Sequence, residues 1–360
     1  MEQEITILGG SIPVPCVQEL AKETPSTVPP RYVRFDDEPP IKSDTASLPQ
    51  VPVIDMQRLF SAEFRDSELD KLDHASKEWG FFQLINHGVS TSLMEKVKVG
   101  MQEFFNLPRE EKKKLWQLPG NIEGFGQAFV VSDEQKLDWG DMFYTITLPI
   151  HLRNFFLKIP LPFRDNLDAY SIEVRDIAKK ILELMAKALR MEHNDMRNLF
   201  EEGFQGMRMN YYPPCPQPEL VMGLNAHSDS VALTILLQIN EMEGLQIRKN
   251  GRWIPVKPLP NAFIVNVGDI LEIVTNGIYR SIEHRATVNS EKERLSMATF
   301  YSPRLEADIG PAPSLITPES PALFKTISMI DFARGSLSHK LDGKAYIDGM
   351  RIQNEEQRGT

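Results

Sequence analysis

Apolar residues recur every three or four positions along several stretches of the chain, which is the spacing of one face of an α-helix. The longest such stretch covers 166–190, and its apolar side consists of Tyr170, Val174, Ile177, Ile181, Leu184 and Ala188. A helix of this length spans roughly 40 Å at 1.5 Å per residue, so we expect it to support a sheet from behind. Further helices are expected over 18–21, 67–79, 90–105, 110–116 and 327–335.

From Gly206 onward the pattern changes to short apolar runs separated by turn residues, which is typical of β-strands. Asn250-Gly251 predicts a hairpin because both residues tolerate positive φ. Residues 232–239 are nearly all apolar, so this strand is expected to be buried on both faces, and Gly268-Asp269 is expected to form a tight turn before a strand. The predicted strands are 51–55, 81–85, 207–212, 232–239, 245–248, 253–256, 262–267, 280–288 and 295–301.

The strand-rich half of the chain therefore contains about eight short strands. Eight antiparallel strands suggest two packed sheets in a jelly roll. The predicted fold class is α+β, with a jelly-roll core, a helical N-terminal region and a long supporting helix.

Composition narrows the range of partners and compartments. The 360 residues carry a formal net charge of −10, which argues against nucleic acid or an anionic membrane as a partner. No apolar run reaches the roughly 18 residues needed to span a bilayer, and the acidic N-terminus lacks the basic region of a signal peptide. The two cysteines, Cys16 and Cys215, make no disulfide framework, so a reducing compartment is expected. We therefore expect a cytoplasmic protein, and a monomer.

Three residues in the strand-rich half are candidate metal ligands: His227, Asp229 and His284. The two-residue step from His227 to Asp229 places both side chains on one face of an extended segment, and His284 would come from a distant strand brought alongside. Two imidazoles and one carboxylate suit Fe(II) when they occupy one face of the metal. Alone, such a His/Asp pair is more often a surface hydrogen bond, so the prediction depends on order and spacing together.

Arg294 and Ser296 repeat the two-residue step shortly after His284. Both side chains are expected on one face of a third strand, where they offer a guanidinium fork and a hydroxyl to one carboxylate. A metal with open positions beside such a pair is typical of a site for a keto-acid co-substrate. His87 follows the strand 81–85 and stands outside this set, so we expect it to make a structural hydrogen bond.

Three longer stretches, together with the candidate site residues, carry a resemblance to a known protein family. They are Trp79-Gly80-Phe81-Phe82-Gln83-Leu84-Ile85-Asn86-His87-Gly88, Asn210-Tyr211-Tyr212-Pro213-Pro214-Cys215-Pro216 and Gly268-Asp269. With them, the chain from about Val51 to Phe324 resembles the plant iron(II)/2-oxoglutarate-dependent dioxygenases. The resemblance implies a double-stranded β-helix core, Fe(II) as the metal, 2-oxoglutarate and O2 as co-substrates, and ascorbate in support.

The resemblance also implies roles for single residues. The far carboxylate of 2-oxoglutarate would meet Arg294 and Ser296, with Tyr212 and Asn210 helping, and no catalytic residue is expected beyond the iron site. The chain would divide into an extended N-terminal arm (1–50), an N-terminal dioxygenase region (51–160), a linking helix (161–203), the Fe(II)/2-oxoglutarate dioxygenase core (204–304) and a C-terminal segment (305–360).

The stretches 207–212 and 236–240 are most similar to the specialised-metabolism branch of this family, which includes benzylisoquinoline alkaloid O-demethylases, norcoclaurine-synthase-like proteins and senescence-related dioxygenases. This implies hydroxylation or O-demethylation of a small aromatic plant metabolite (an alkaloid, flavonoid or related phenolic), coupled to formation of succinate and CO2. The expected substrate-lining residues are Phe300, Phe125, Phe129, Met142 and Tyr144; for the last four, core packing is an equal interpretation. The alternative function is a non-oxidative binding or cyclising protein on the same fold.

Overall fold

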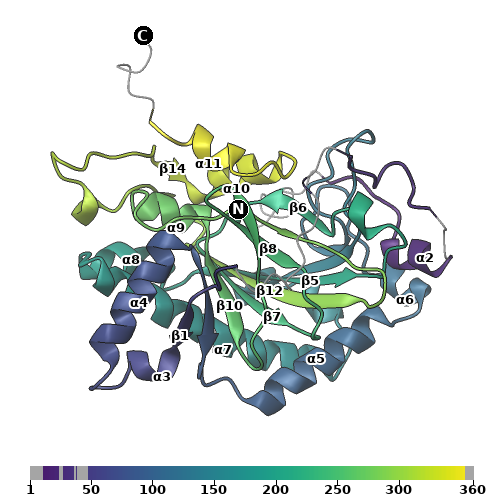
Figure 1. The fold of residues 1–360 in the computed structure, drawn as a ribbon, viewed down its shortest axis with the longest axis horizontal. Coiled ribbons are helices and arrows are strands. Elements are labelled where there is room, and N and C mark those ends of the chain that lie inside the picture. Colours follow the sequence, from purple (N-terminus) through teal and green to yellow (C-terminus); the bar gives the residue numbers. More distant parts are fainter. Residues whose placement is uncertain (1–10, 24–26, 36–37, 39–47, 353–360) are drawn as a thin grey trace, which may run out of the picture.

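The computed structural model describes residues 11–23, 27–35, 38 and 48–352. In this part of the chain, eight strands form a main sheet and four strands form a minor sheet packed against it (Figure 1). In spatial order the main sheet contains β1 (Val53–Asp55), β2 (Phe81–Ile85), β10 (Phe263–Val267), β7 (Leu233–Gln238), β12 (Arg294–Ser302), β5 (Phe204–Tyr212), β4 (Asp141–Leu148) and β3 (Gly124–Gly126). The minor sheet contains β6 (Leu224–His227), β11 (His284–Ala286), β8 (Leu245–Lys249) and β9 (Arg252–Pro255). The α+β jelly roll expected from the sequence is confirmed.

Helices cover the side of the main sheet that faces away from the minor sheet, and the C-terminal helices lie near β6 (Figure 1). The long helix predicted over 166–190 is present as α7 and begins three residues earlier. The α-helices are α2 (Val17–Lys22), α3 (Met56–Leu59), α4 (Arg65–Glu78), α5 (Thr91–Phe105), α6 (Arg109–Lys113), α7 (Phe163–Ala188), α8 (His193–Phe200), α9 (Asp269–Val274), α10 (Met329–Leu337) and α11 (Ala345–Gly349). A further short strand pair consists of β13 (Asp308–Ile309) and β14 (Ile327–Ser328), and single 3-10 turns lie at Ile150–Leu152, Phe156–Lys158, Pro218–Leu220 and Pro313–Leu315.

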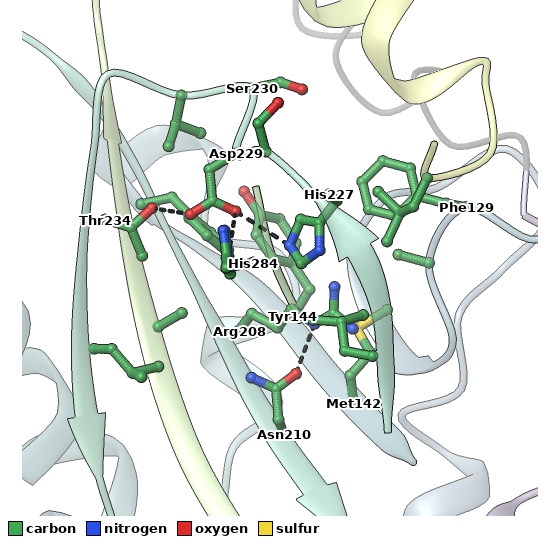
Figure 2. A pocket seen from close by; sticks show the side chains of 18 of the residues that line it. Phe129, Met142, Tyr144, Arg208, Asn210, His227, Asp229, Ser230, Thr234 and His284 are labelled. Atoms are coloured by element: carbon green, nitrogen blue, oxygen red, sulfur yellow. Dashed lines mark hydrogen bonds and ion pairs between the residues drawn. The ribbon is translucent and has the colours of Figure 1, made fainter. Parts of the chain in front are cut away.

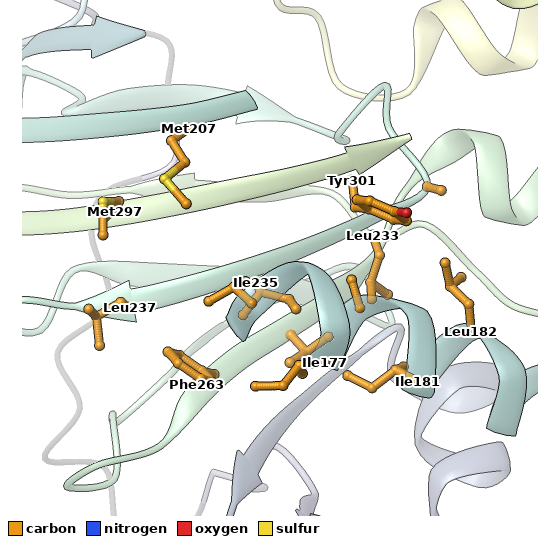
Figure 3. Packing of buried hydrophobic residues seen from close by; sticks show 14 of the residues in the cluster. Ile177, Ile181, Leu182, Met207, Leu233, Ile235, Leu237, Phe263, Met297 and Tyr301 are labelled. Carbon is orange, nitrogen blue, oxygen red and sulfur yellow. The ribbon is translucent and has the colours of Figure 1, made fainter. Parts of the chain in front are cut away.

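The contact between α7 and the main sheet forms the largest part of the core (Figure 3). The helix contributes Ile177, Ile181 and Leu182, and the strands contribute Met207, Leu233, Ile235, Leu237, Phe263, Met297 and Tyr301. Full burial of one Leu, Ile, Met or Phe side chain stabilises a fold by roughly 1.5–3 kcal/mol. This layer therefore holds the sheet in place and leaves its other face available for a site.

The expectation that 232–239 is buried on both faces is confirmed only in part, because Thr234 on the second face is buried whereas Leu236 and Gln238 are partly exposed. Leu233, Ile235 and Leu237 face the core, whereas Leu236, between them in the sequence, is partly exposed and lines a cavity. The reason is the alternation of side chains along a strand, because here the second face of the sheet borders a hollow.

The tight turn expected at Gly268-Asp269 is instead the start of helix α9. Gly268 permits this start because a Cβ atom there would lie 2.1 Å from the Val231 carbonyl oxygen. The Asp269 N–H donates to the Asp229 carbonyl (2.8 Å), so α9 is fixed to the segment that follows β6. The strand predicted over 280–288 is shorter than expected: β11 covers His284–Ala286, and its pairing with β6 shifts register between these two residues.

Two local expectations, the hairpin and the role of His87, are confirmed. Asn250 and Gly251 join β8 to β9 with φ of 51° and 76°. The His87 Nε2 lies 3.0 Å from the Asn261 carbonyl, so this histidine makes the expected structural hydrogen bond. Cys215 is buried among apolar side chains. Within the described ranges, no helix combines the length and apolar character needed to cross a bilayer.

The N-terminal arm is only partly described, since residues 1–10, 24–26, 36–37 and 39–47 lie outside the described residues, as do 353–360 at the other end. The short helix expected in the arm is present as α2. The Asp141 carboxylate accepts hydrogen bonds from the N–H groups of Val17 (2.9 Å) and Gln18 (2.8 Å). This fixes α2 beside β4.

Candidate functional site

The three candidate metal ligands come together where the two sheets meet (Figure 2). His227 is the last residue of β6, Asp229 lies two residues later, and His284 opens β11 directly opposite His227 in the ladder. One ligand atom from each lies within 4.8 Å of the others. Asp229 Oδ1 is 3.4 Å from His227 Nε2 and 3.6 Å from His284 Nε2, and all three side chains are buried.

Each imidazole is oriented by the backbone two residues before it. His227 Nδ1 lies 2.7 Å from the Asn225 carbonyl, and His284 Nδ1 lies 3.1 Å from the Ile282 carbonyl. A carbonyl only accepts, so both Nδ1 atoms carry the proton and both Nε2 atoms keep a lone pair. The lone pairs are directed toward Asp229, which is the arrangement that a metal ion requires of its histidine ligands.

The carboxylate is oriented from the opposite side by two side chains that sequence analysis missed. Asp229 Oδ2 accepts hydrogen bonds from Thr234 Oγ1 (2.6 Å) and Asn266 Nδ2 (2.8 Å), so Oδ1 is left to face the imidazoles. Thr234 and Asn266 are polar residues inside apolar strands, β7 and β10. A polar residue within an apolar strand is a signal of a buried polar contact that the sequence does contain. It does not show that the contact of Thr234 and Asn266 is with Asp229.

The site favours a charged carboxylate and at least one neutral imidazole. Burial opposes ionisation of Asp229, but the adjacent imidazoles, His284 first, and the Thr234 hydrogen bond hold the pKa of this carboxyl well below its usual range. Burial lowers the pKa of His284 to about 4. These are the protonation states that metal coordination needs.

The donor set fits Fe(II). Neighbouring ligands of a metal bound at about 2.1 Å lie roughly 3 Å apart, so the separations of 3.4 and 3.6 Å need only a small closure. Two imidazoles and one carboxylate on a single side of the metal form the facial set found in non-haem Fe(II) oxygenases. Ser228 and Ser230 flank Asp229 and line the cavity beside it.

The predicted carboxylate-binding pair lies on β12 and lines the same cavity. Arg294 and Ser296 point to one face of the strand, and the Arg294 Nη1 is 3.4 Å from the Ser296 Oγ. The guanidinium donates from Nη2 to Gln238 Oε1 (2.9 Å) and lies 5.4 Å above the Tyr212 ring. Among the described residues the buried Arg294 Nε has no hydrogen-bond partner, so a donor remains for a ligand.

Asn210 and Tyr212 lie on β5, opposite Ser296 and Arg294 in the ladder. The structure therefore brings all four residues predicted to bind 2-oxoglutarate beside one another. The Asn210 Oδ1 accepts a hydrogen bond from the Arg208 Nε (2.7 Å), which turns the amide nitrogen of Asn210 the other way. Arg208 was missed by sequence analysis, although its two-residue spacing from Asn210 predicts the same face of the strand.

A cavity of about 220 Å³ connects the metal-ligand set, the Arg294 pair and a largely apolar wall. Four of the five predicted substrate-lining residues border it: Phe129, Met142, Tyr144 and Phe300. Phe125 does not. It pairs with Phe143 in the ladder of β3 and β4, and both rings face the main core, whereas Met142 and Tyr144 on the same strand face the cavity.

Comparison with known proteins agrees with this geometry. Residues 203–303 match the family model of the 2OG-Fe(II) oxygenase superfamily, and residues 51–157 match the model described as the N-terminal region of non-haem dioxygenases in morphine synthesis. The chain belongs to the 2OG-Fe(II) oxygenase superfamily. It is a 2-oxoglutarate-dependent dioxygenase that uses Fe(II), as the resemblance in its sequence implied.

Relatives of this oxygenase are similar along nearly its whole length. The oxoglutarate-dependent flavonoid 7-O-demethylase 1 of Ocimum basilicum is 58% identical, with 98% of this chain and 94% of the relative covered. The codeine O-demethylase of Papaver somniferum is 54% identical, with 98% and 100% covered. Among solved structures, JOX2 in complex with 2OG, Fe and JA superposes with a TM-score of 0.87 at 34% identity, covering 95% of this chain and 99% of that one.

The oxygenase cavity is closed on one side by the C-terminal part of the chain. Helix α10 contributes Met329, Ala333, Ser336 and Leu337 to its wall, and Leu341 follows the helix. These residues were not predicted, because sequence analysis assigned the segment after 305 no place in the site.

Proposed function

We propose that this oxygenase hydroxylates or O-demethylates a small aromatic metabolite, such as a flavonoid, an alkaloid or a related phenolic. The observation that supports this proposal most directly is the composition of the cavity wall. Next to the His/Asp/His set, the cavity is bordered by Phe129, Tyr144 and Phe300, whose rings offer flat apolar contacts to another aromatic ring. The activities named for the flavonoid and codeine demethylases point the same way.

We propose that His227, Asp229 and His284 bind the Fe(II) ion and that Arg294 and Ser296 bind the far carboxylate of 2-oxoglutarate. The buried positive charge of Arg294 and its free Nε support this assignment, since a planar guanidinium can engage a carboxylate with two hydrogen bonds. Tyr212 supports the guanidinium from below, and Asn210 lies beside Ser296 in the ladder.

Bound Fe(II) with 2-oxoglutarate supplies the activation of O2 and the oxidising power for C–H attack, with succinate and CO2 as co-products. The chain's own contribution is positioning. Asn225 and Ile282 fix the two imidazoles, Thr234 and Asn266 fix the carboxylate, and the apolar wall excludes water from the reacting groups. Holding a substrate C–H close to the metal in the right orientation lowers the entropic part of the barrier.

Arg208 narrows the substrate class. Its guanidinium lines the cavity, and no carboxylate of a described residue lies within ion-pair distance of it. A cation that lines a cavity without a carboxylate partner favours a ligand that accepts hydrogen bonds. We therefore propose an aromatic substrate that carries a carbonyl, phenolate or carboxylate oxygen on the side facing β5.

The decisive experiment compares Asp229→Ala with the wild-type enzyme and with Asp66→Ala, which alters a surface carboxylate that is 89% exposed. With Fe(II), 2-oxoglutarate and a panel of methoxylated flavonoids and alkaloids, we expect succinate and product from the wild type and from Asp66→Ala. We expect Asp229→Ala to lose at least about a hundredfold in turnover, the upper range for changes beside a metal site. Circular dichroism should show that all three proteins are folded.

Two outcomes would contradict the proposal. Succinate release by Asp229→Ala at the wild-type rate would exclude the iron assignment. Product formation without succinate or consumption of 2-oxoglutarate would instead favour the non-oxidative alternative on the same fold.

We also propose that the enzyme acts in the cytoplasm as a monomer. Cys16 and Cys215 are free thiols, as is usual in a reducing compartment. Light scattering on the purified protein and cell fractionation would test the two parts separately: a dimer mass or an extracellular fraction would contradict them.

A further inference from the structure

The strand that carries His227 is covered on both sides. β6 is the edge strand of the minor sheet, and on its inner side it pairs with β11, where His284 lies opposite His227. On its outer side it meets residues 341–351 of the C-terminal segment, because His227 and Gly343 form a parallel bridge. The Gly343 N–H donates to the Ala226 carbonyl (3.1 Å), and the Ser228 N–H donates to the Gly343 carbonyl (3.1 Å).

The same C-terminal segment contacts the residue that orients the His227 ring. The Asn225 carbonyl is the partner of His227 Nδ1, and the Asn225 side-chain Nδ2 donates to the Leu341 carbonyl (3.1 Å). Residues 341–343 therefore hold the backbone immediately before and after His227. In Figure 1 the yellow C-terminal helices lie over this end of the molecule, next to β6.

A buried carboxylate anchors this segment to the fold. Glu272 on α9 is 3% exposed, and both of its oxygens bind cations that belong to the C-terminal segment. Lys344 Nζ lies 2.7 Å from Oε2, and Arg351 Nη2 lies 2.8 Å from Oε1. The Ser281 N–H also donates to Oε2 (2.8 Å), and the Ser281 carbonyl accepts from Lys344 (2.6 Å). Loss of one cation would leave a buried charge only partly compensated.

We infer that the C-terminal segment 341–351 completes the iron site, and that Glu272, Lys344 and Arg351 are positioning residues acting through Gly343 and Asn225 on His227. This inference rests on the proposed assignment of His227 as an iron ligand. Groups outside the ligands themselves set ligand orientation, and their removal typically weakens metal affinity about 10–100-fold. An edge strand without its cover also exposes unpaired backbone groups to water, so β6 would lose order when the segment detaches.

The segment has a second consequence for the cavity. Leu337 and Leu341 form part of its wall, and Leu341 directly precedes the bridge to β6. Attachment of the segment through Glu272 therefore has two effects: it orders His227, and it closes the cavity against water. Detachment should weaken Fe(II) binding and let 2-oxoglutarate turn over without substrate oxidation.

The test measures Fe(II) affinity by anaerobic titration in the absence of 2-oxoglutarate, on the full chain. Lys344→Met is compared with wild type, with the conservative Lys344→Arg and with Lys325→Met. Lys325 is an exposed lysine of the same C-terminal part that makes no ion pair with any described residue. We expect the dissociation constant for Fe(II) to rise about tenfold in Lys344→Met, to recover largely in Lys344→Arg and to stay unchanged in Lys325→Met. Amide hydrogen exchange should accelerate in peptides that contain Ser228.

Arg351→Met provides a second variant on the same carboxylate, and its side chain is 41% exposed, so it removes less buried structure if Lys344→Met fails to fold. An Fe(II) affinity equal to wild type in the folded variants, even with a lowered melting temperature, would overturn the inference, because it would make the contact purely structural. If wild type and Lys325→Met also fail to bind Fe(II), the iron assignment itself is wrong and the inference falls with it.

Discussion

On the face of the main sheet that contacts α7, strands β5, β7 and β12 present only buried, mostly apolar side chains. On the opposite face the same strands present the polar groups of the site. The α7 face includes Met207, Met209, Leu233, Ile235, Leu237, Leu295 and Met297, and the site face includes Arg208, Asn210, Tyr212, Thr234, Gln238, Arg294 and Ser296. In all three strands odd-numbered residues face the helix and even-numbered residues face the cavity.

This difference separates two kinds of stabilisation within one sheet. The α7 face is held by apolar burial, whose loss appears in the free energy of unfolding. The site face consists of buried polar groups that orient one another, such as Thr234 with Asp229 and Gln238 with Arg294. Their loss should appear in ligand affinity, because the groups they orient are the ones that meet the metal and the co-substrate.

The largest expected effect on stability comes from Ile235→Ala on the α7 face. Ile235 is fully buried in the main core, so truncation should lower the free energy of unfolding by roughly 2–5 kcal/mol. The neighbouring Leu236→Ala, on the site face, should cost less because Leu236 is already partly exposed to the cavity. Urea unfolding of both variants measures this difference.

Enzyme kinetics on the same two variants give a second comparison of the two faces. The folded fraction of Ile235→Ala should keep the wild-type KM for 2-oxoglutarate, whereas Leu236→Ala should alter steady-state constants for the substrate. Equal stability losses at the two positions would show that the faces are not energetically distinct.

The sequence predicted those parts of this arrangement that depend on local spacing along a strand. It did not predict several parts that depend on contacts between separate strands. The two-residue steps from His227 to Asp229 and from Arg294 to Ser296 are local patterns, and from them the sequence predicted that each pair shares one face. For Phe125 the sequence left the cavity and the core open as equal interpretations, because β3 has only three residues and its pairing with β4 decides which way the ring points. Thr234 and Asn266 lie 5 and 37 residues from Asp229, and sequence alone gives no measure of such contacts.

The helix α9 was missed for a related reason. Its six residues Asp-Ile-Leu-Glu-Ile-Val are too few to show a helical period, and all of them are buried. The turn expected at Gly268-Asp269 followed from the dipeptide alone. The role of Glu272 likewise depends on two cations 72 and 79 residues away, which only the folded chain brings together.

An intermediate effect is expected for Thr234→Val on the site face. The change keeps the β-branched shape but removes the hydrogen bond to Asp229 Oδ2. Fe(II) affinity should fall about 10–100-fold, and the free energy of unfolding should fall by about 1.5–3 kcal/mol, since this hydrogen bond is made to a charged group. Anaerobic titration with Fe(II) gives the affinity.

The matched control is Thr299→Val on β12, a buried threonine of the α7 face. Thr299 lies on the opposite face of the sheet from the metal-ligand set and does not line the cavity, so Fe(II) affinity should stay at the wild-type value. If the two valine variants bound Fe(II) equally, the orientation of Asp229 by Thr234 would have no functional role.

The smallest effect is expected for Arg294→Lys, which keeps the positive charge of the site face but removes the planar fork. Lysine would lose the paired contacts to Gln238 and Ser296 and the contact with the Tyr212 ring. The KM for 2-oxoglutarate should rise about tenfold, equivalent to about 1.4 kcal/mol, with a near-normal kcat at saturating 2-oxoglutarate. Succinate release measured over a range of 2-oxoglutarate concentrations separates the two constants.

Arg153→Lys is the control for this change, because Arg153 is also largely buried but binds Asp168 (2.7 Å) outside the cavity. It should lower stability and leave the KM for 2-oxoglutarate unchanged. A rise in KM for Arg153→Lys, or an unchanged KM for Arg294→Lys, would mean that the guanidinium on the site face acts through the fold and not on the co-substrate. A change in KM confined to the Arg294 variant would instead show that 2-oxoglutarate is recognised by the even-numbered residues of β12, which lie on the site face of the sheet.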